Sequence, residues 1–516
     1  MKKLVGFVLL TIIAIVVLNT FISLPKNSRY IPENSAALIR FDIASLVMKA
    51  DYKELLENKT IADALEELGT PFTDWAEKPS STGIDWRGTA YFALTLPEEE
   101  YGDPTFSLII PVKNSKKLES ALTDLWKEEN DESIKLLNAN GYTRIEMEEE
   151  SEVQIGFNKK ALIIAFSDFD PVDPKFIDNL FVQKKAPKQP GLRPFLRSND
   201  DIAGWINYKA LKNVATGLKV ALSGGNSDAV TLALNFEKGK IEGSATAYYA
   251  DGSRKKMAGK GISSSLTKAL PRDALAYAAV SVDMKNCTDE LLSNLEYVGL
   301  SKDMLDEGLR SMIGLSVSET QELFSGDVAL AFKDVKLVEH TLDYGEGSTV
   351  YKTPVPSFII AADIDSDDHC KKLLSTLEEN GTLEMLNQSD VELFERKGTM
   401  YCGIGDFMDN VKEKGKAEKA VNGKIKRLLK KHHAAIYVDL ERTADLIEKF
   451  DLLNEKPLRL VRTFKSAELT GDFKRKTEEA VLLIEMADKK QNSLKTIIEQ
   501  ALDLFLVRIY VLSAPQ

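Results

Sequence analysis

Two stretches of the chain share one pattern of apolar and polar positions. They read YIPENSAALIRFDIASLVMKADYKELLEN (Tyr30–Asn58) and ALPRDALAYAAVSVDMKNCTDELLSNLEY (Ala269–Tyr297). In each, a Pro precedes a short apolar run that ends at an Asp, and apolar residues then recur at helical spacing, so the pattern predicts a strand followed by a helix. We expect Asp42 and Asp283 to accept hydrogen bonds from backbone N–H groups at the helix start, and not to act as catalytic acids.

The segments after these two openings also match each other in the same order. WRGTAYFAL corresponds to FSGDVALAF, FSLIIPVKNSKKLESAL to PSFIIAADIDSDDHCKKLLSTL, DIAGWINYKALKNV to KKHHAAIYVDLERTADLIE, and AVTLALNFEKGKIEGSATAYYAD to AELTGDFKRKTEEAVLLIEMAD. With the openings, these are five matches in register. The period is far longer than that of solenoid repeats, so the pattern indicates a tandem duplication of a whole domain.

The predicted fold class is α+β, because strands in adjacent hairpins mix with helices instead of alternating strictly with them. We expect an N-terminal transmembrane helix followed by two tandem homologous α+β halves with largely antiparallel sheets. The first half covers residues 30–250, a polar Gly/Ser-rich linker covers 251–268, and the second half covers 269–516. The second half ends in a short apolar stretch interrupted by charges, Ala501–Ala514, which predicts a packed C-terminal helix.

Residues 1–29 predict the location of the protein. Lys2 and Lys3 precede Leu4–Ser23, a run of 20 residues without a charge. As a helix this run reaches about 30 Å, the thickness of the hydrocarbon core of a bilayer. A cleavable signal peptide would have a shorter apolar region and a small-residue cleavage site, although cleavage stays open as the alternative. We therefore expect a single-pass anchor and tether in the inner (cytoplasmic) membrane, with the bulk of the chain exported.

The composition of the chain limits which partners it can bind and which chemistry its cysteines can perform. Apolar residues make up 44% of the 516 residues, so a sizeable core can form. The net charge of −12 opposes binding to the phosphates of nucleic acid. The chain has three cysteines, Cys287, Cys370 and Cys402. They form no CxxC motif, and their small, odd number is not typical of a disulfide framework. A single pair between Cys370 and Cys402 stays open beside the simpler reading of three small buried side chains.

No residue is assigned a catalytic, cofactor-binding or metal-binding role. Asp363, Asp365 and Asp367 stand at the first, third and fifth places of a calcium-binding loop. The sixth place of such a loop needs Gly and here holds Asp368, and the twelfth needs Glu and here holds Leu374. The spacing is therefore typical of a helix start, where Asp suits the helix dipole.

The basic segment Lys424–His433 ends in two adjacent histidines. His432 and His433 stand at a predicted strand entrance, where neighbouring side chains point to opposite faces, so we do not expect them to hold one metal ion. The segment itself predicts an amphipathic helix with a solvated basic face. Contact with anionic lipid head groups is the alternative.

The helix entrances that follow two matched strands differ in charge. The first carries lysines and the second aspartates (Lys113, Lys116 and Lys117; Asp365, Asp367 and Asp368). We expect the two entrances to face different partners, or to meet each other between neighbouring molecules. Drift on a solvated face is the alternative.

The N-terminal export segment, the opening IP…A…D…SL and the later LP…A…D resemble bacterial envelope proteins of a domain-of-unknown-function family, of the Bacteroidota type. The resemblance implies an envelope location and supplies no functional residues. Such proteins often carry a lipoprotein cysteine, which this chain lacks, so an inner-membrane anchor is favoured.

From these observations we expect a non-enzymatic binding or scaffolding protein. Its expected partners are the membrane, through the N-terminal helix, and an envelope protein, with no cofactor and no nucleic acid. A binder of lipid or another apolar ligand and a hydrolase with an unrecognised site are the alternatives. The oligomeric state is left open.

Overall fold

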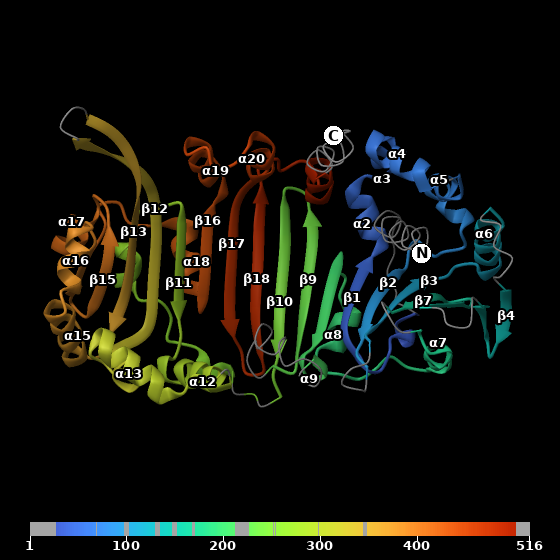
Figure 1. The fold of residues 1–516 in the computed structure, drawn as a ribbon, viewed down its shortest axis with the longest axis horizontal. Helices are drawn as coiled ribbons and strands as arrows, with labels where there is room; N and C mark the ends of the chain where they lie inside the picture. The colour runs from blue at the N-terminus through green and yellow to red at the C-terminus, as the bar shows by residue number, and fades with distance from the viewer. Residues whose placement is uncertain are drawn as a thin grey trace. The chain divides into compact units, whose positions relative to one another are not determined.

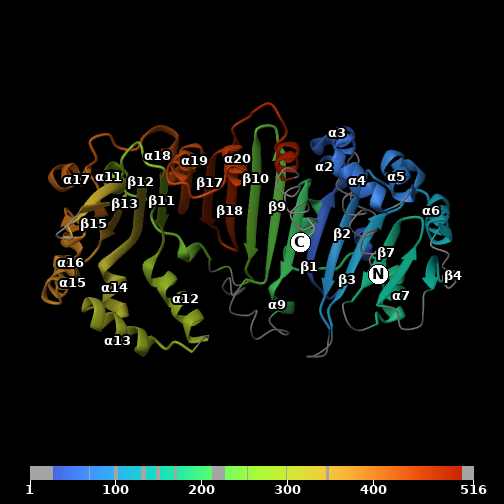
Figure 2. The same ribbon diagram turned by 45° about the horizontal axis from the view of Figure 1, so that its top comes forward.

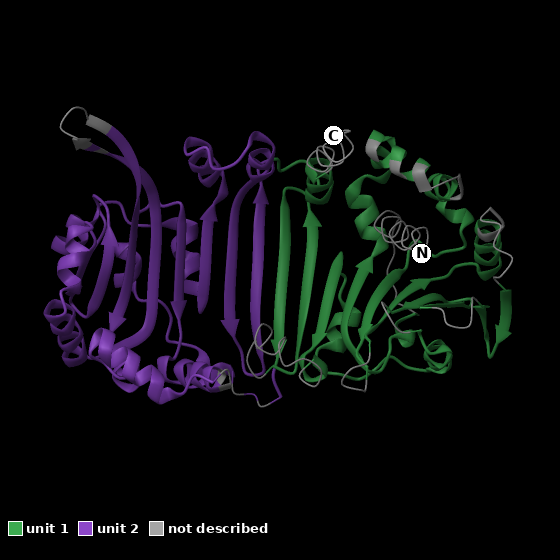
Figure 3. Ribbon diagram, viewed as in Figure 1, with its two compact units in different colours: residues 1–222, 226–248, 488–516 green, residues 223–225, 249–487 purple. Residues whose placement is uncertain are grey.

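The computed structural model describes residues 27–68, 70–97, 103–128, 135–146, 152–167, 171–211, 227–250, 252, 254–297, 299–343 and 348–501. The chain divides into two compact units, coloured separately in Figure 3. Unit 1 comprises residues 1–222, 226–248 and 488–516, and unit 2 comprises residues 223–225 and 249–487.

Unit 1 is built on an antiparallel sheet (Figure 1). Its described strands are β1 (Ser35–Asp42), β2 (Thr89–Thr95), β3 (Thr105–Pro111), β4 (Lys135–Ala139), β5 (Tyr142–Glu146), β6 (Val153–Phe157), β7 (Ala161–Phe166), β8 (Ile202–Asn207), β9 (Ala229–Glu237) and β10 (Lys240–Tyr248). They pair in the order β10–β9–β8–β1–β2–β3–β7–β6–β5–β4, and every pair is antiparallel. The first strand of the chain therefore lies inside the sheet, between β8 and β2.

Helices cover both faces of part of this sheet. They are η1 (Ser28–Tyr30), α2 (Ile43–Ala50), α3 (Tyr52–Glu57), α4 (Lys59–Leu68), α5 (Thr70–Glu77), η2 (Pro79–Ser81), α6 (Ser115–Glu128), α7 (Pro174–Val182), α8 (Leu192–Arg197) and α9 (Tyr208–Leu211). On one face, Ile43 of α2 and Leu118 of α6 pack in a cluster with Leu108 of β3. On the other face, residues of α7 and α8 pack in a second cluster with Trp205 of β8.

Unit 2 is also built on an antiparallel sheet. Its described strands are β11 (Ala276–Ser281), β12 (Phe324–Asp343), β13 (Ser348–Ile364), β14 (Glu392–Arg396), β15 (Thr399–Ile404), β16 (Ala434–Asp439), β17 (Phe464–Phe473) and β18 (Thr477–Met486). They pair in the order β14–β15–β13–β12–β11–β16–β17–β18. Again the first strand of the unit lies inside the sheet, here between β12 and β16.

The helices of unit 2 cover one face of its sheet more fully than the other. They are η3 (Arg254–Met257), α11 (Ser264–Ala269), α12 (Met284–Tyr297), α13 (Lys302–Ile313), α14 (Val317–Leu323), α15 (Asp367–Glu379), α16 (Thr382–Gln388), α17 (Met408–Lys414), α18 (Gly423–Lys431), α19 (Leu440–Lys449) and α20 (Glu455–Arg462). Leu266 of α11, Val411 of α17 and Leu429 of α18 belong to one buried cluster with the central strands. Helices α12 and α13 lie at one end of the strands in both views (Figures 1 and 2).

Each central strand passes into a helix at a capping Asp. The Asp42 carboxylate accepts a hydrogen bond of 2.9 Å from the Ser45 N–H, and that of Asp283 accepts one of 2.9 Å from the Asn286 N–H. Such a cap satisfies a backbone donor that has no partner within the helix. The predicted local role of Asp42 and Asp283 is confirmed.

The expected fold class, an N-terminal transmembrane helix followed by two α+β halves, is wrong. Large antiparallel sheets form the framework of both units, and β12 and β13 alone contribute strands of 20 and 17 residues. Within the described part of the chain, no helix is long and apolar enough to cross a membrane. The stretch Leu4–Ser23 lies outside the described residues, as does most of the expected C-terminal helix. The error has a physical reason: the sequence pattern assigned no element to residues 333–355, but most of them extend β12 and β13 as a hairpin whose backbone groups pair with each other.

The residues expected to form a linker contain ordered elements. Residues 251–268 include η3 and the start of α11, and their described members belong to unit 2. Leu266 is fully buried and Arg254 is 5% exposed. The few apolar residues of this polar segment therefore dock onto the sheet, which composition alone does not indicate.

Candidate functional site

The most extensive surface feature of unit 2 is an open, apolar sheet face. Three successive outward positions on each of six strands hold only Ala, Gly, Val, Leu, Ile or Phe, and their registers place them on the same side of the sheet. We call this set the open face; its three rows are Phe358, Phe332, Ala276, Val438, Ala467 and Ile484; Ile360, Leu330, Ala278, Ile436, Leu469 and Leu482; and Ala362, Val328, Val280, Ala434, Gly471 and Ala480.

Every residue of the open face is at least partly accessible. Ile436 and Leu469, which are directly opposite each other on β16 and β17, are 42% and 41% exposed. The alternate residues of the same strands, such as Tyr277 and Ala331, are fully buried against helices. Figure 1 shows β16, β17 and β18 without a helix drawn across them on the viewed side. The strands β11, β12 and β13 are therefore apolar on both faces, and helices bury one of these faces. On the side of the open face, α14 and α15 pack with Met400 of β15, beside the open face.

The open face lies at the upper end of the usual size range, since the largest apolar patch on a typical monomer covers about 300–600 Å². Six strands spaced about 4.8 Å apart, with three outward positions on each, span roughly 600 Å². Contiguous apolar patches on soluble monomers rarely exceed a few hundred Å², and larger ones mark interaction sites. The chemistry of such a surface is limited to burial of apolar area, because its side chains offer no donor, acceptor or charge.

Unit 1 has an apolar sheet surface of its own. Phe92, Phe106 and Phe166 lie beside each other on β2, β3 and β7, with ring centroids 5.4–6.3 Å apart, and all three are partly exposed. Ile39 on β1 and Leu232 on β9 are 39% and 44% exposed. An accessible apolar surface is thus found in each unit considered by itself.

Sequence reasoning missed the open face, although one indication was present. The strands of unit 2 read as nearly continuous apolar runs, such as ALAYAAV and SFIIAA, where a half-solvated antiparallel strand would alternate. Continuous apolar runs are typical of a sheet that is covered on both faces. In this unit the described helices bury one face of β11, β12 and β13 and leave the open face accessible, so the runs indicate a further covering element there.

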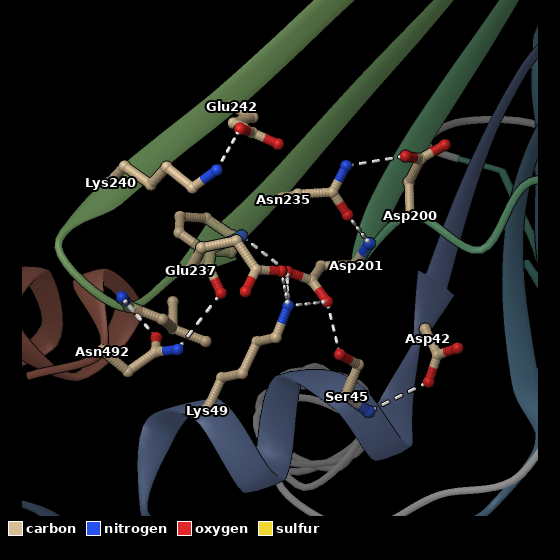
Figure 4. A network of polar contacts seen from close by, with 12 residues as sticks. Asp42, Ser45, Lys49, Asp200, Asp201, Asn235, Glu237, Lys240, Glu242 and Asn492 are labelled. Atoms are coloured by element: carbon tan, nitrogen blue, oxygen red, sulfur yellow. Dashed lines mark hydrogen bonds and ion pairs between the residues drawn. The ribbon is translucent and has the colours of Figure 1, made fainter. Parts of the chain in front are cut away.

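A buried polar network in unit 1 is the next candidate (Figure 4). Asp201, just before β8, is 1% exposed, and its carboxylate accepts hydrogen bonds from the Ser45 hydroxyl, the Lys49 ammonium at 2.8 Å and the Phe236 N–H at 2.6 Å. Lys49 Nζ also lies 3.0 Å from Glu237 Oε1. The network joins α2 to β8 and β9.

The protonation of Lys49 decides what this network can do. Burial by itself lowers the pKa of Lys49, but the hydrogen bonds to Asp201 and Glu237 outweigh burial and hold that pKa above its ordinary value. Lys49 therefore stays protonated and cannot act as a general base. The arrangement holds the sheet and α2 together and offers no catalytic group.

The two adjacent histidines do not diverge as predicted. His432 Nδ1 lies 2.7 Å from Asp472 Oδ2, and His433 Nδ1 lies 3.0 Å from Asp472 Oδ1. Both rings reach one carboxylate because His432 still belongs to the end of α18, before the alternation of β16 begins. Within the described residues, no group of three or more His, Cys, Asp or Glu side chains could hold a metal ion.

The aspartates of the rejected calcium loop are distributed around the start of α15. Asp363 accepts a hydrogen bond of 2.9 Å from the Thr399 hydroxyl, while Asp365 and Asp367 are exposed. The helix is capped by Ser366, whose hydroxyl accepts from the His369 N–H at 3.4 Å. These side chains therefore serve the strand and the helix start.

The cysteines are free thiols in the structure. Cys370 is buried, and no disulfide joins it to Cys402. Burial raises the pKa of Cys287 to about 11 and raises the pKa of the other two thiols as well. A thiol with a raised pKa is a poor nucleophile, so none of the three is activated.

The two helix entrances of opposite charge are both exposed. At α6, Asn114 accepts from the N–H groups of Lys116 and Lys117 at 3.1 and 3.2 Å, and the lysine side chains lie in solvent. At α15, Asp365, Asp367 and Asp368 lie in solvent as well. Each entrance is capped by an uncharged side chain, and two of the charges have local partners: Lys117 Nζ donates to the Ser80 carbonyl at 3.2 Å, and Asp368 lies 3.9 Å from Lys371 Nζ.

Comparison with known proteins gives a family match and weak structural likenesses. A family model described as a domain of unknown function (DUF4836) matches residues 28–393. Structures of TP0453 in crystal forms IV and I are 11% and 10% identical to the chain, with TM-scores of 0.28 and 0.27. They cover 43% and 45% of this chain and 81% of their own, and likenesses of this extent carry no argument. The search of curated proteins gives no match.

Proposed function

The chain belongs to the family described as a domain of unknown function (DUF4836), and from that premise we propose that it is a non-enzymatic binding protein of the bacterial cell envelope. In this proposal an apolar surface of a partner protein docks on the open face of unit 2. The observation that carries the proposal is the uninterrupted set of accessible apolar residues on six neighbouring strands.

The shape of the surface favours a protein over a small apolar ligand. A small ligand is held in a concave, mostly apolar pocket that buries most of its surface. The depressions found in the described residues, of about 440 and 230 Å³, lie in unit 1 and are lined largely by polar and charged side chains. An open sheet face instead suits a helix or a second sheet packed across it.

The area sets a limit on the contact. About 600 Å² is less than the roughly 800 Å² that each partner contributes to a standard interface. The partner must therefore also touch the surroundings of the open face. Because the face is purely apolar, it supplies affinity by burial and leaves specificity to those surroundings.

The absence of enzymatic activity and the location are parts of the same proposal. The protonated Lys49 and the unactivated cysteines support a non-enzymatic role. The uncharged run Leu4–Ser23 supports a location at the inner membrane with the bulk of the chain exported, as in envelope proteins of the Bacteroidota type.

Site-specific photo-crosslinking in membranes of the producing cell tests the proposal. A photoreactive amino acid at Ile436 is expected to give a discrete adduct with another protein. Leu469→Lys is expected to abolish this adduct without changing the unfolding midpoint, because a lysine on a solvent-facing strand position leaves the core intact. The control position is Val481, which is 49% exposed on β18 but pairs with Thr470, on the opposite side from Leu469.

Three results would contradict the proposal. Adducts with lipid alone would assign the face to an apolar ligand or to the membrane. An adduct within the chain, to residues 1–26 or 502–516, would show that the protein covers its own face. Equal protein adducts from positions 436 and 481 would show that the open face has no special role.

A further inference from the structure

A second surface, in unit 1, has a chemistry opposite to that of the open face. A depression of about 440 Å³ is lined by three cationic side chains, Arg29, Lys159 and Lys160, and by one acidic side chain, Glu119. The chain as a whole carries a net charge of −12, so this depression differs in sign from the average surface. A concave site with an excess of cations concentrates anions.

The side chain of Arg29 is held in place by the neighbouring Tyr30. Its guanidinium lies 4.5 Å from the centre of the Tyr30 ring and donates a hydrogen bond to the Tyr30 hydroxyl. The Tyr30 side chain is fully buried and packs against Phe181, with ring centroids 5.4 Å apart. A cation fixed in this way loses little conformational entropy when an anion binds.

The two lysines have exposed side chains and stand on a turn whose backbone is fixed. Asn158, between β6 and β7, accepts hydrogen bonds from the Lys160 and Ala161 N–H groups at 2.8 and 3.1 Å. The Asn158 amide donates to the Tyr30 hydroxyl at 2.9 Å. The turn that carries Lys159 and Lys160 is therefore coupled through Tyr30 to the residue that positions Arg29.

These cations have no acidic partner in the described part of the chain. No ion pair there joins Arg29, Lys159 or Lys160 to a carboxylate, although many other lysines and arginines of the chain form such pairs. Ser115 and Asn138 also line the depression and add a hydroxyl and an amide. Three unpaired cations with neutral donors beside them are the groups that recognise a phosphate.

We propose that this depression binds a phosphate-bearing group of net negative charge. Its volume exceeds that of a phosphate ion and lies in the range of sites for whole small molecules, so the ligand carries further atoms beyond the phosphate. A glycerophosphate head group of an anionic lipid and a soluble phosphorylated molecule share this chemistry. The inference goes beyond the proposed docking of a protein, and it concerns different residues in a different unit.

The position of Arg29 in the chain makes the lipid source testable. Arg29 follows the last residue of the uncharged run, Ser23, by six residues, which span at most about 20 Å when extended. If that run crosses the bilayer, the depression lies within reach of the head groups. This reach rests on the proposed location, whereas the phosphate site itself does not.

Calorimetric titration of the full chain in nonionic detergent tests the site. The probes are dihexanoyl phosphatidylglycerol, dihexanoyl phosphatidylcholine and inorganic phosphate, the lipids below their micelle concentrations. K159Q/K160Q is expected to weaken phosphatidylglycerol binding about 30-fold, which is about 1 kcal/mol for each charge at 1.4 kcal/mol per tenfold. K184Q/K185Q, which alters two exposed lysines after α7, is the matched control and is expected to change binding less than twofold.

The outcomes distinguish a lipid head group from a soluble phosphorylated molecule as the source of the phosphate. Binding of phosphatidylglycerol without binding of inorganic phosphate supports the site and assigns it to a lipid head group. Binding of both, with competition between them, supports the site and assigns it to the phosphate alone. Equal weakening in the two double variants, equal affinity for phosphatidylcholine, or no binding of either anionic probe overturns the inference.

Discussion

Replacing the buried Asp201 by Asn should destabilise unit 1 substantially. The substitution keeps the shape of the side chain but removes the charge that pairs with Lys49 and one of the oxygens that accept from Lys49, Ser45 and the Phe236 N–H. Removing one partner of a buried ion pair costs about 3–5 kcal/mol, because the other charge is left without compensation.

The structure places the expected loss at the lower end of that range. Lys49 keeps Glu237 at 3.0 Å, and its side chain is 18% exposed, so part of its charge remains compensated. We therefore expect D201N to lower the free energy of unfolding by about 3 kcal/mol. With a urea dependence of about 3 kcal/mol per molar, the midpoint falls by about 1 M.

Tryptophan fluorescence in urea is the suitable assay. All four tryptophans, Trp75, Trp86, Trp126 and Trp205, belong to unit 1, so the signal reports on that unit. E242Q is the control: it breaks the exposed ion pair with Lys240 on β10 and should cost about 1 kcal/mol or less.

A double variant isolates the cause. In D201N/K49M the uncompensated ammonium is removed, so the loss should be smaller than the sum of the two single losses. If D201N lies within about 0.5 kcal/mol of the parent protein, the network does not hold α2 to the sheet and this reasoning is refuted.

Two further predictions concern unit 2. Hydrogen bonds from Lys372 and from the Ser316 N–H lower the pKa of Glu319 to about 2, so its stabilising contribution is present above pH 4.5 and is lost as the pH falls toward 2. In the parent protein the amides of α14 should therefore lose protection against hydrogen exchange as the pH falls from 4.5 to 2, and E319Q should make this loss smaller. The exposed E322Q is the control and should leave the loss unchanged. An equal loss of protection in E319Q and the parent protein would contradict this prediction. The Arg254 side chain is 5% exposed and contacts the Glu290 carboxylate through two guanidinium nitrogens. Its guanidinium also lies 3.1 Å from Glu478 and 3.8 Å from the centre of the Tyr249 ring. R254K should therefore lower the free energy of unfolding by about 2–3 kcal/mol, because a lysine loses the two-nitrogen contact and the stacking on the ring. Circular dichroism in urea measures this loss against the exposed R462K, and similar losses in the two variants would argue against it.

Local hydrogen bonding was the most predictable part of the structure. An Asp between an apolar run and a helical pattern can satisfy the first free N–H groups of the helix without help from distant residues. Asp42 and Asp283 therefore behave as the sequence indicates. The opening strand and helix of each unit, β1 with α2 and β11 with α12, also follow from periodicity, which depends only on neighbouring residues.

The histidines show where local reasoning fails. Alternation of side chains holds inside a strand, but His432 precedes β16, so its direction is set by the end of α18. The meeting of both rings at Asp472 depends on β17, which is distant in the chain. The same holds for Arg29 and Lys159, which are separated by 130 positions and line one depression because η1 docks beside the turn between β6 and β7.

The sequence by itself determined which residues are apolar, the opening strand and helix of each unit, and the uncharged run near the N-terminus, because each of these is a property of consecutive residues. Only the tertiary structure decided which apolar strand faces are covered. Tyr277 and Ala278 are consecutive residues in one apolar run of β11. Tyr277 is buried under helices, whereas Ala278 belongs to the open face. Burial depends on which distant elements pack against a strand, and the alternating side chains of a strand that is apolar on both faces do not reveal it.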